Sequence, residues 1–129
     1  MINYILLIGG LLGLISVGMG AYVDHVLSQV LDMKTLAMVK TALHYHQIYA
    51  VMIAGIGLVC HKKASLFLKL SAWIFIIGVI FFSFSIYLTA LTGVMEWIKL
   101  TPVGGTLLMV GWLVVLIGAS FRKMHAESH

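Results

Sequence analysis

Charged side chains are scarce in this sequence. Asp, Glu, Lys and Arg make up 9% of the 129 residues and hydrophobic residues 62%, whereas soluble domains have roughly 25% and 45–50%. A chain of this length buries only about two-thirds of its surface on folding, so in water it would expose large apolar patches. The composition therefore excludes a soluble globular domain and predicts a protein whose main partner is the lipid bilayer.

Cysteine is almost absent, because Cys60 is the only one. A single cysteine excludes an intramolecular disulfide, a Cys-x-x-Cys redox pair and a cysteine-based zinc site. The net charge of +4 does not indicate a nucleic-acid partner, because the basic residues form no single stripe. They lie in or near the gaps between apolar runs, where lipid headgroups would meet them.

Four apolar runs predict four membrane-spanning helices in one transmembrane domain, residues 1–129. We predict helices over about 4–23, 33–60, 66–92 and 102–121, and a short amphipathic helix in 24–32. About 20 helical residues cross a hydrocarbon core of roughly 30 Å. The expected fold class is all-α, an integral membrane four-helix bundle with an amphipathic segment between the first two spanning helices.

Local signals mark the helix ends and the orientation. Asp32 is the expected N-cap of the second spanning helix, and Thr101 with Pro102 predicts an N-cap followed by proline at the first helical position. Gly93 is a stop signal for the third helix. Five basic residues flank the side that holds both termini, against three on the other side, so we expect both termini in the cytoplasm. The five are Lys62, Lys63, Lys69, Arg122 and Lys123, and the three are Lys34, Lys40 and Lys99.

Small residues recur at helical spacing and predict close helix packing. The packing candidates are Gly9, Gly13, Ser16, Gly20, Gly78, Gly104, Gly111 and Gly118. One of these small faces is also a candidate for self-association, as a homo-oligomer or with another membrane protein.

The candidate functional patch is a group of polar side chains, which cost free energy in lipid. Its members are Asp24, His25, His44, Tyr45, His46, Gln47 and Tyr49, with Ser83, Ser85 and Tyr87 on the third helix. His44 and His46 project about 200° apart on a helix, so a metal or haem site would also need His25. We favour the plainer interpretation, an interfacial belt whose imidazoles bond to loop backbone or water. The serines and Tyr87 either line a polar path or bond across helices.

No complete catalytic constellation is present, and no Asp, Glu, Lys or Arg lies near the centre of a predicted span. We therefore expect no enzyme activity, no cofactor and no metal. The first hypothesis is a membrane component that self-associates or serves as an accessory or scaffold subunit. The second is a small oligomeric transporter or channel for a small solute or lipid. The third is a metal or haem protein that uses His25 with His44 or His46.

Four stretches resemble the YgdD-like family of small membrane proteins of unknown function. They are GMGAYVDHVL from Gly18, LDMKTLAMVKTALHYHQIYA from Leu31, FFSFSIYLTALTG from Phe81 and LTPVGGTLLMVGW from Leu100. Two departures are visible: Val23 and Asp24 precede His25 where the family usually has glycine and alanine, and Tyr49 stands where it commonly has histidine. The resemblance implies a four-helix protein of the bacterial inner membrane and supplies no activity.

Overall fold

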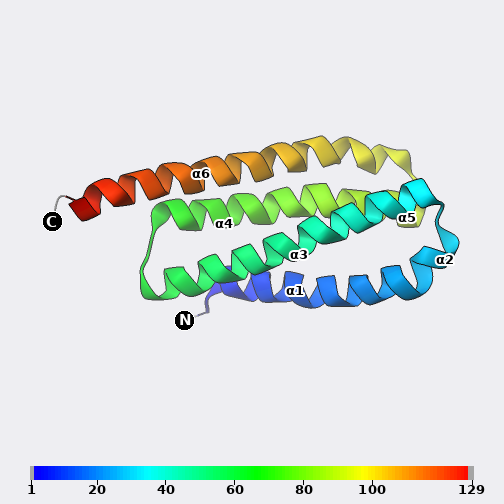
Figure 1. The fold of residues 1–129 in the computed structure, drawn as a ribbon, viewed down its shortest axis with the longest axis horizontal. Helices are drawn as coiled ribbons and strands as arrows, with labels where there is room; N and C mark the ends of the chain where they lie inside the picture. The colour runs from blue at the N-terminus through cyan, green and yellow to red at the C-terminus, as the bar shows by residue number, and fades with distance from the viewer. Residues whose placement is uncertain (1, 128–129) are drawn as a thin grey trace.

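The long helices run side by side, and the described part of the chain begins and ends at the same end of the bundle (Figure 1). The computed structural model describes residues 2–127, and the side chains of residues 2–121. Residues 2–127 contain no β-strand. Four helices are long and apolar enough to cross a membrane. The predicted fold class, an all-α bundle of four spanning helices, is confirmed.

The first spanning helix is longer than the sequence suggests. It comprises α1 (Tyr4–Tyr22), a π-helical segment η1 (Val23–Leu27) and α2 (Ser28–Val30), which form one helix from Tyr4 to Val30. The separate amphipathic helix expected in 24–32 is instead the end of this helix. No glycine or proline interrupts residues 21–31, and Val23 and Leu27 are buried in the core. The Ser28 hydroxyl donates to the Asp24 carbonyl at 2.7 Å, which gives this carbonyl of the π-helical segment a partner.

The second spanning helix is α3 (Met33–Lys62). Asp32 stands before it in an extended conformation and accepts a hydrogen bond from the Thr35 amide at 3.3 Å. Hydrogen bonds from the Thr35 side chain and then from its amide hold the pKa of Asp32 below its usual range. The carboxylate therefore supplies the cap that the first turn of a helix requires.

The third spanning helix contains a second π-helical segment. It consists of α4 (Leu66–Val79), η2 (Ile80–Phe84) and α5 (Ser85–Thr92). Gly93 ends it in the left-handed conformation, with φ of 74°, and its amide donates to the Thr89 carbonyl at 3.0 Å. Glycine adopts this conformation without steric cost, so the stop signal acts where the sequence places it.

The fourth spanning helix begins earlier than Pro102. A 3₁₀ segment η3 (Met95–Leu100) leads directly into α6 (Thr101–Glu127). Thr101 has helical φ and ψ of −59° and −47°, so the expected N-cap role for Thr101 is wrong. Its hydroxyl instead lies 2.6 Å from the Ser85 hydroxyl. An N-cap residue needs a non-helical backbone, and η3 holds Thr101 inside a continuous helix.

Two antiparallel helix pairs make up the bundle: α1 packs mainly on α3, and α4 mainly on α6. A Cβ atom on Gly9 would lie 2.6 Å from the Ala54 nitrogen, and one on Gly57 would lie 2.7 Å from the Leu6 nitrogen. Glycine at these two positions therefore lets the backbones of α1 and α3 approach. By contrast, a Cβ atom on Gly13 would meet nothing within 4 Å, so Gly13 takes no part in this contact.

In the pair formed by α4 and α6, three glycines of α6 spaced seven residues apart allow close packing. A Cβ atom on Gly104 would lie 2.7 Å from the Gly78 carbonyl oxygen, one on Gly111 would meet the Phe75 ring, and one on Gly118 would meet Phe67. Each glycine thus receives backbone or an aromatic side chain from α4 or η2. Of the other predicted packing residues, Gly20 lies near Gln47, and Ser16 is buried with its hydroxyl on the Gly13 carbonyl.

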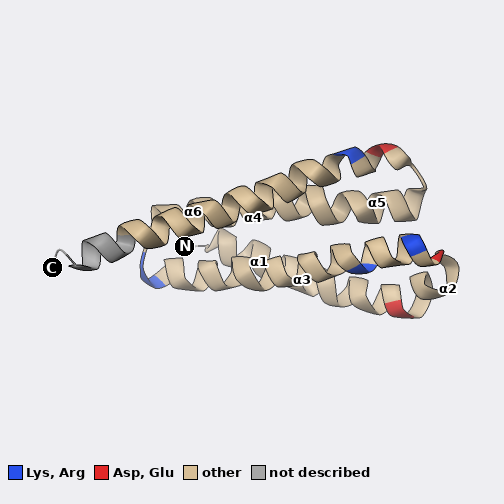
Figure 2. Cartoon of the chain, turned by 45° about the horizontal axis from the view of Figure 1, so that its top comes forward, with Lys and Arg blue, Asp and Glu red and all other residues tan. Residues whose placement is uncertain are grey.

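Charged residues lie toward the two ends of the bundle (Figure 2). Asp24, Asp32 and Glu96 occur at the end formed by α2, with Lys34, Lys40 and Lys99, and the loop after α3 carries Lys62 and Lys63 at the other. Arg122 and Lys123 belong to the last turns of α6, whose side chains lie outside the described residues. The middle of the bundle is left to apolar and uncharged polar side chains.

Candidate functional site

The predicted polar patch is divided into two groups by the structure. His46, Tyr49, Ser83, Ser85 and Tyr87 are buried. Asp24, His25, His44, Tyr45 and Gln47 are exposed. The patch is therefore not one surface. Half of it belongs to the interior of the bundle, where side chains from different helices meet.

His46 lies at the centre of the buried group and is fully buried. Its Nε2 atom lies 2.9 Å from the Leu12 carbonyl oxygen of α1, and its Nδ1 atom lies 3.0 Å from the Tyr87 hydroxyl of α5. A carbonyl can only accept, so Nε2 carries the proton and donates. The Tyr87 hydroxyl can then donate to Nδ1, which satisfies the neutral imidazole completely. His46 does not bond to loop backbone or water, as an interfacial belt would require.

Hydroxyl groups connect the other helices around this histidine. Ser83, in η2, donates to the Ala42 carbonyl of α3 at 2.7 Å. Ser85 bonds to the Phe82 carbonyl and to Thr101 of α6. Among the described residues, every buried side-chain nitrogen and oxygen has a hydrogen-bond partner. This group of residues therefore joins α1, α3, α5 and α6 and leaves no buried donor free to bind a ligand.

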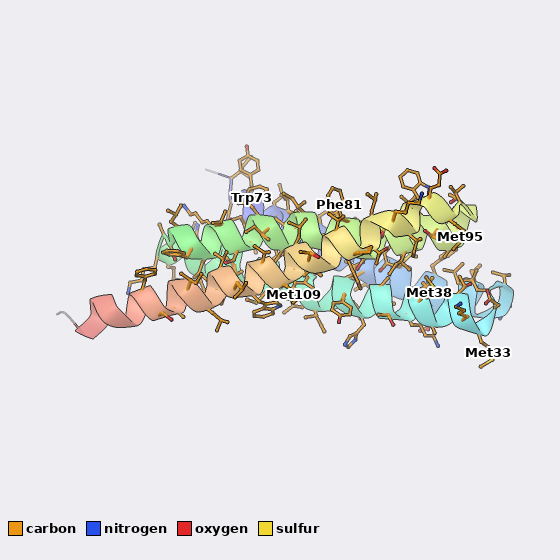
Figure 3. The ribbon with its side chains drawn as sticks, turned by 90° about the horizontal axis from the view of Figure 1, so that it is seen from above. Met33, Met38, Trp73, Phe81, Met95 and Met109 are labelled. Carbon is orange, nitrogen blue, oxygen red and sulfur yellow. The ribbon has the colours of Figure 1, made fainter. Side chains whose placement is uncertain are left out.

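Tyr49 links the two helix pairs at a second point. Its hydroxyl accepts a hydrogen bond from the Trp112 indole nitrogen of α6 at 2.7 Å. A groove of about 470 Å³ opens beside this bond between α3 and α6, and Met109, labelled in Figure 3, lies on its α6 side. Tyr45 also lines the groove, where it stacks on Tyr49 with 6.2 Å between ring centroids and stays 38% exposed.

The exposed polar residues of α3 lie within an uncharged stretch long enough to cross a membrane. Residues 41–60, between Lys40 and His61, carry no formal charge, and these 20 residues rise about 30 Å, the thickness of the hydrocarbon core. Along the helix axis, His44, Tyr45 and Gln47 lie within about 10 Å of Lys40. We call His44 and Gln47, which project about 60° apart on the helix, the α3 polar face; Tyr45 projects about 160° from Gln47, toward the groove. Polar side chains within a membrane-spanning segment normally face a bundle interior or another polar group, so their exposure is unusual.

The histidines do not come together as a metal site. Among the described residues, no three His, Cys, Asp or Glu side chains lie close enough to hold one metal ion. Both ring nitrogens of His46 already have hydrogen-bond partners. His25 and His44 are exposed, on η1 and on α3 respectively. A metal or haem could recruit His46 only by breaking one of its two hydrogen bonds.

Residues 19–105 match the family model described as protein of unknown function (DUF423). The chain belongs to this family. The matched segment of this DUF423 protein includes His46, Ser83 and Tyr87, and it ends just after Gly104. It therefore contains the side chains of the buried group, whereas the carbonyl partner Leu12 lies before it.

Relatives of known name cover nearly the whole chain. The UPF0382 inner membrane protein YgdD of Escherichia coli is 30% identical over 98% of this chain and 97% of its own length. A UPF0382 membrane protein of Haemophilus influenzae is 33% identical over 94% and 96%, and one of Staphylococcus saprophyticus is 33% identical over 88% and 93%. No solved structure matches the chain. The names and the four apolar helices together identify this DUF423 member as a membrane protein.

Several residues of the site carry no signal that sequence reasoning could use. The Leu12 carbonyl is a backbone group, and any residue would offer it. Phe84 packs against the His46 ring with centroids 5.2 Å apart, but nothing distinguishes it from the other phenylalanines of its helix. Asn3 is more informative: its Oδ1 caps α1 on the Leu6 amide, and its Nδ2 donates to the Gly57 carbonyl at 2.9 Å. Asparagine directly before an apolar run is an N-cap signal.

Proposed function

We propose that this protein is a non-enzymatic membrane component that self-associates or serves as an accessory subunit through the α3 polar face. The observation that supports the proposal is the exposure of His44 and Gln47 within the uncharged part of α3. A second membrane helix packed here would provide hydrogen-bond partners that lipid tails lack. Such bonds stabilise helix association by about 0.6 kcal/mol on average and up to about 1.7 kcal/mol each.

The groove beside the α3 polar face provides a concave surface for a partner helix. It is lined by aromatic residues of α3 and η2 and by Gly105 and Thr106 of α6. Small residues beside aromatic ones form a hollow that a helix side chain can enter, which favours van der Waals contact, the main attraction between helices in lipid. Self-association is our first choice because a copy of the chain offers the same polar groups in return.

The alternative is a small oligomeric transporter or channel for a small solute or lipid. Within one chain, the hydroxyls and the imidazole that would line its path already bond to one another and to backbone carbonyls. A path would therefore lie between subunits, and this alternative also requires association. A metal or haem function that uses His25 with His46 requires His46 to release the Leu12 carbonyl or Tyr87. One that uses His25 with His44 has no third His, Cys, Asp or Glu close enough among the described residues. This function is therefore the weakest of the three.

We further propose the bacterial inner membrane as the location, with both termini in the cytoplasm. The E. coli relative is named as an inner membrane protein, which supports the location. Five basic residues near the termini end against three at the opposite end support the orientation, because basic loops remain in the cytoplasm.

Site-directed cross-linking tests the association. Cys60→Ser removes the only cysteine, and His44→Cys then places one cysteine on the α3 polar face. Leu14→Cys, at an exposed position of α1, is the matched control. In native membranes, oxidation of the His44→Cys protein should give a dimer or one recurrent adduct with another membrane protein, and the control should give neither.

The two products separate the two forms of the proposal, since a dimer indicates self-association and an adduct an accessory role. Adding Gln47→Leu should lower the cross-linked fraction about threefold, as expected from loss of about 0.6 kcal/mol. Equal cross-linking at positions 44 and 14, or none at either, would show that α3 is not the interface.

A further inference from the structure

A second groove lies at the other end of the bundle, between the beginning of α1 and the outer face of α4. It measures about 480 Å³ and is lined by Asn3, Tyr4 and Ile5 of the N-terminal segment, by His61 of α3 and by Lys69 and Trp73 of α4. Trp73 projects outward from α4 and is labelled in Figure 3. Nothing in the buried polar group or the α3 polar face reaches this groove.

The electrostatic surroundings of the groove favour an anion. Lys69 lines it, and the loop after α3 adds Lys62 and Lys63 at the same end, while Asp24, Asp32 and Glu96 lie at the opposite end (Figure 2). The first turn of α1 also lines the groove, and the N-terminus of a helix carries partial positive charge. A basic pocket between spanning helices, close to the membrane surface, is suited to a lipid headgroup.

The outward face of α4 carries a basic, an aromatic and an aliphatic side chain in succession along the helix. Lys69 lies one turn into the helix, Trp73 follows four residues later at 41% exposed, and Ile77 follows four residues after that at 47% exposed. Residues at this spacing share one face, and the eight residues rise about 12 Å. A cation, an amphipathic indole and an apolar side chain match the phosphate, the ester region and the acyl chain of a phospholipid.

We propose that this groove is a binding site for one anionic phospholipid, with its phosphate at Lys69 and its acyl chain along Trp73 and Ile77. Asn3 holds the site in shape, because its side-chain bond to the Gly57 carbonyl fixes the beginning of α1 against α3. The inference is independent of the association through α3, since the two surfaces share no residue.

Native mass spectrometry of the full-length protein tests the site. The protein is released from detergent micelles that contain equal amounts of phosphatidylglycerol and phosphatidylcholine with identical acyl chains. Wild type should retain phosphatidylglycerol preferentially. Lys69→Gln should lower the ratio of bound phosphatidylglycerol to phosphatidylcholine about fivefold, the effect of one lysine near a charged surface, and Lys69→Arg should preserve it.

Lys99→Gln, at the opposite end of the bundle, is the matched control and should leave the ratio unchanged. Trp73→Leu should weaken retention of both lipids, and free glycerol phosphate should not displace them because it lacks acyl chains. Should Lys69→Gln lose its helical circular dichroism, His61→Gln tests the same groove. Equal retention of the two lipids by wild type, an equal effect of Lys99→Gln, or displacement by glycerol phosphate would overturn the proposal.

Discussion

At the residue scale, His46 and His44 show how two identical side chains acquire different roles. They are two positions apart on α3, so they point to nearly opposite sides of the helix. His46 faces α1 and α5, where the Leu12 carbonyl and the Tyr87 hydroxyl complete its hydrogen bonds. His44 is exposed. Burial with both partners makes His46 a structural residue, and exposure makes His44 a candidate contact for another helix.

A double-mutant cycle measures the bond between His46 and Tyr87. Tyr87→Phe should lower the free energy of unfolding by about 1–3 kcal/mol, because the buried Nδ1 atom of His46 is left without a donor. His46→Leu should cost more, about 1–3 kcal/mol beyond the packing change, because the Tyr87 hydroxyl is left buried and unpaired. The double variant should be more stable than the sum of the single effects predicts, because it leaves no unpaired hydroxyl.

Unfolding by denaturant in detergent micelles, followed by circular dichroism, provides the measurement. Tyr22→Phe is the control, because Tyr22 is 42% exposed, and it should be close to neutral. Strict additivity of the two single effects would mean that the two side chains do not interact.

At the element scale, glycines set the distances between helices and π-helical segments adjust their shape. Gly104 lies against the backbone of η2, with the Gly78 carbonyl and the main chain of Phe81 and Phe82 as its neighbours. A π-helical segment leaves backbone groups without their usual partners, and Ser28 and Ser85 each bond to a carbonyl within or beside such a segment. At η2, therefore, a π-helical segment and a close glycine contact between helices occur at the same place.

The paired substitutions Gly104→Ala and Gly13→Ala test this role of glycine. At Gly104 an added methyl group collides with backbone atoms, which cannot move aside like a flexible side chain, so we expect a loss of about 1–3 kcal/mol in stability. At Gly13 the same methyl group meets nothing within 4 Å, so we expect no loss. The midpoint of thermal unfolding in micelles should fall for the first variant only. A similar fall for both would contradict the assigned contact.

At the scale of the whole molecule, charge and hydropathy determine how the bundle sits in a membrane. The charged residues lie toward its two ends (Figure 2), and the exposed side chains between them are mostly apolar. The bundle therefore presents an apolar surface about as thick as the hydrocarbon core of a bilayer. Basic residues at both ends are available to the lipid headgroups.

Cysteine labelling in intact bacteria tests the proposed orientation. In the Cys60→Ser background, Met95→Cys places a thiol at the beginning of η3, and Ala64→Cys places one in the loop after α3. Both positions are exposed. A membrane-impermeant maleimide should label the Met95→Cys protein in intact cells with a permeable outer membrane. The Ala64→Cys protein should react only after the inner membrane is opened. The reverse pattern would place both termini outside the cytoplasm.

The amino-acid sequence by itself determined the membrane class, the number of spanning helices and most of their ends. These features depend on neighbouring residues: apolar runs of about 20 residues, the carboxylate of Asp32 before α3, and Gly93 at the end of α5. The errors lie where burial adds to the local pattern: α1 continues into α2 because Val23 and Leu27 are buried in the core and no glycine or proline stops the helix. Thr101 resembles a cap because it precedes Pro102. Its actual partner, Ser85, lies 16 residues away, where a local pattern does not reach.

Only the tertiary structure decided which polar residues are inside the bundle and which face the lipid. His46 meets Leu12 from 34 residues away and Tyr87 from 41, and Tyr49 meets Trp112 from 63. Helical periodicity separates the two sides of α3, but it does not tell which side another helix will cover. That choice depends on the glycine contacts between helices, which set where the backbones approach, and hence on the whole chain packed together.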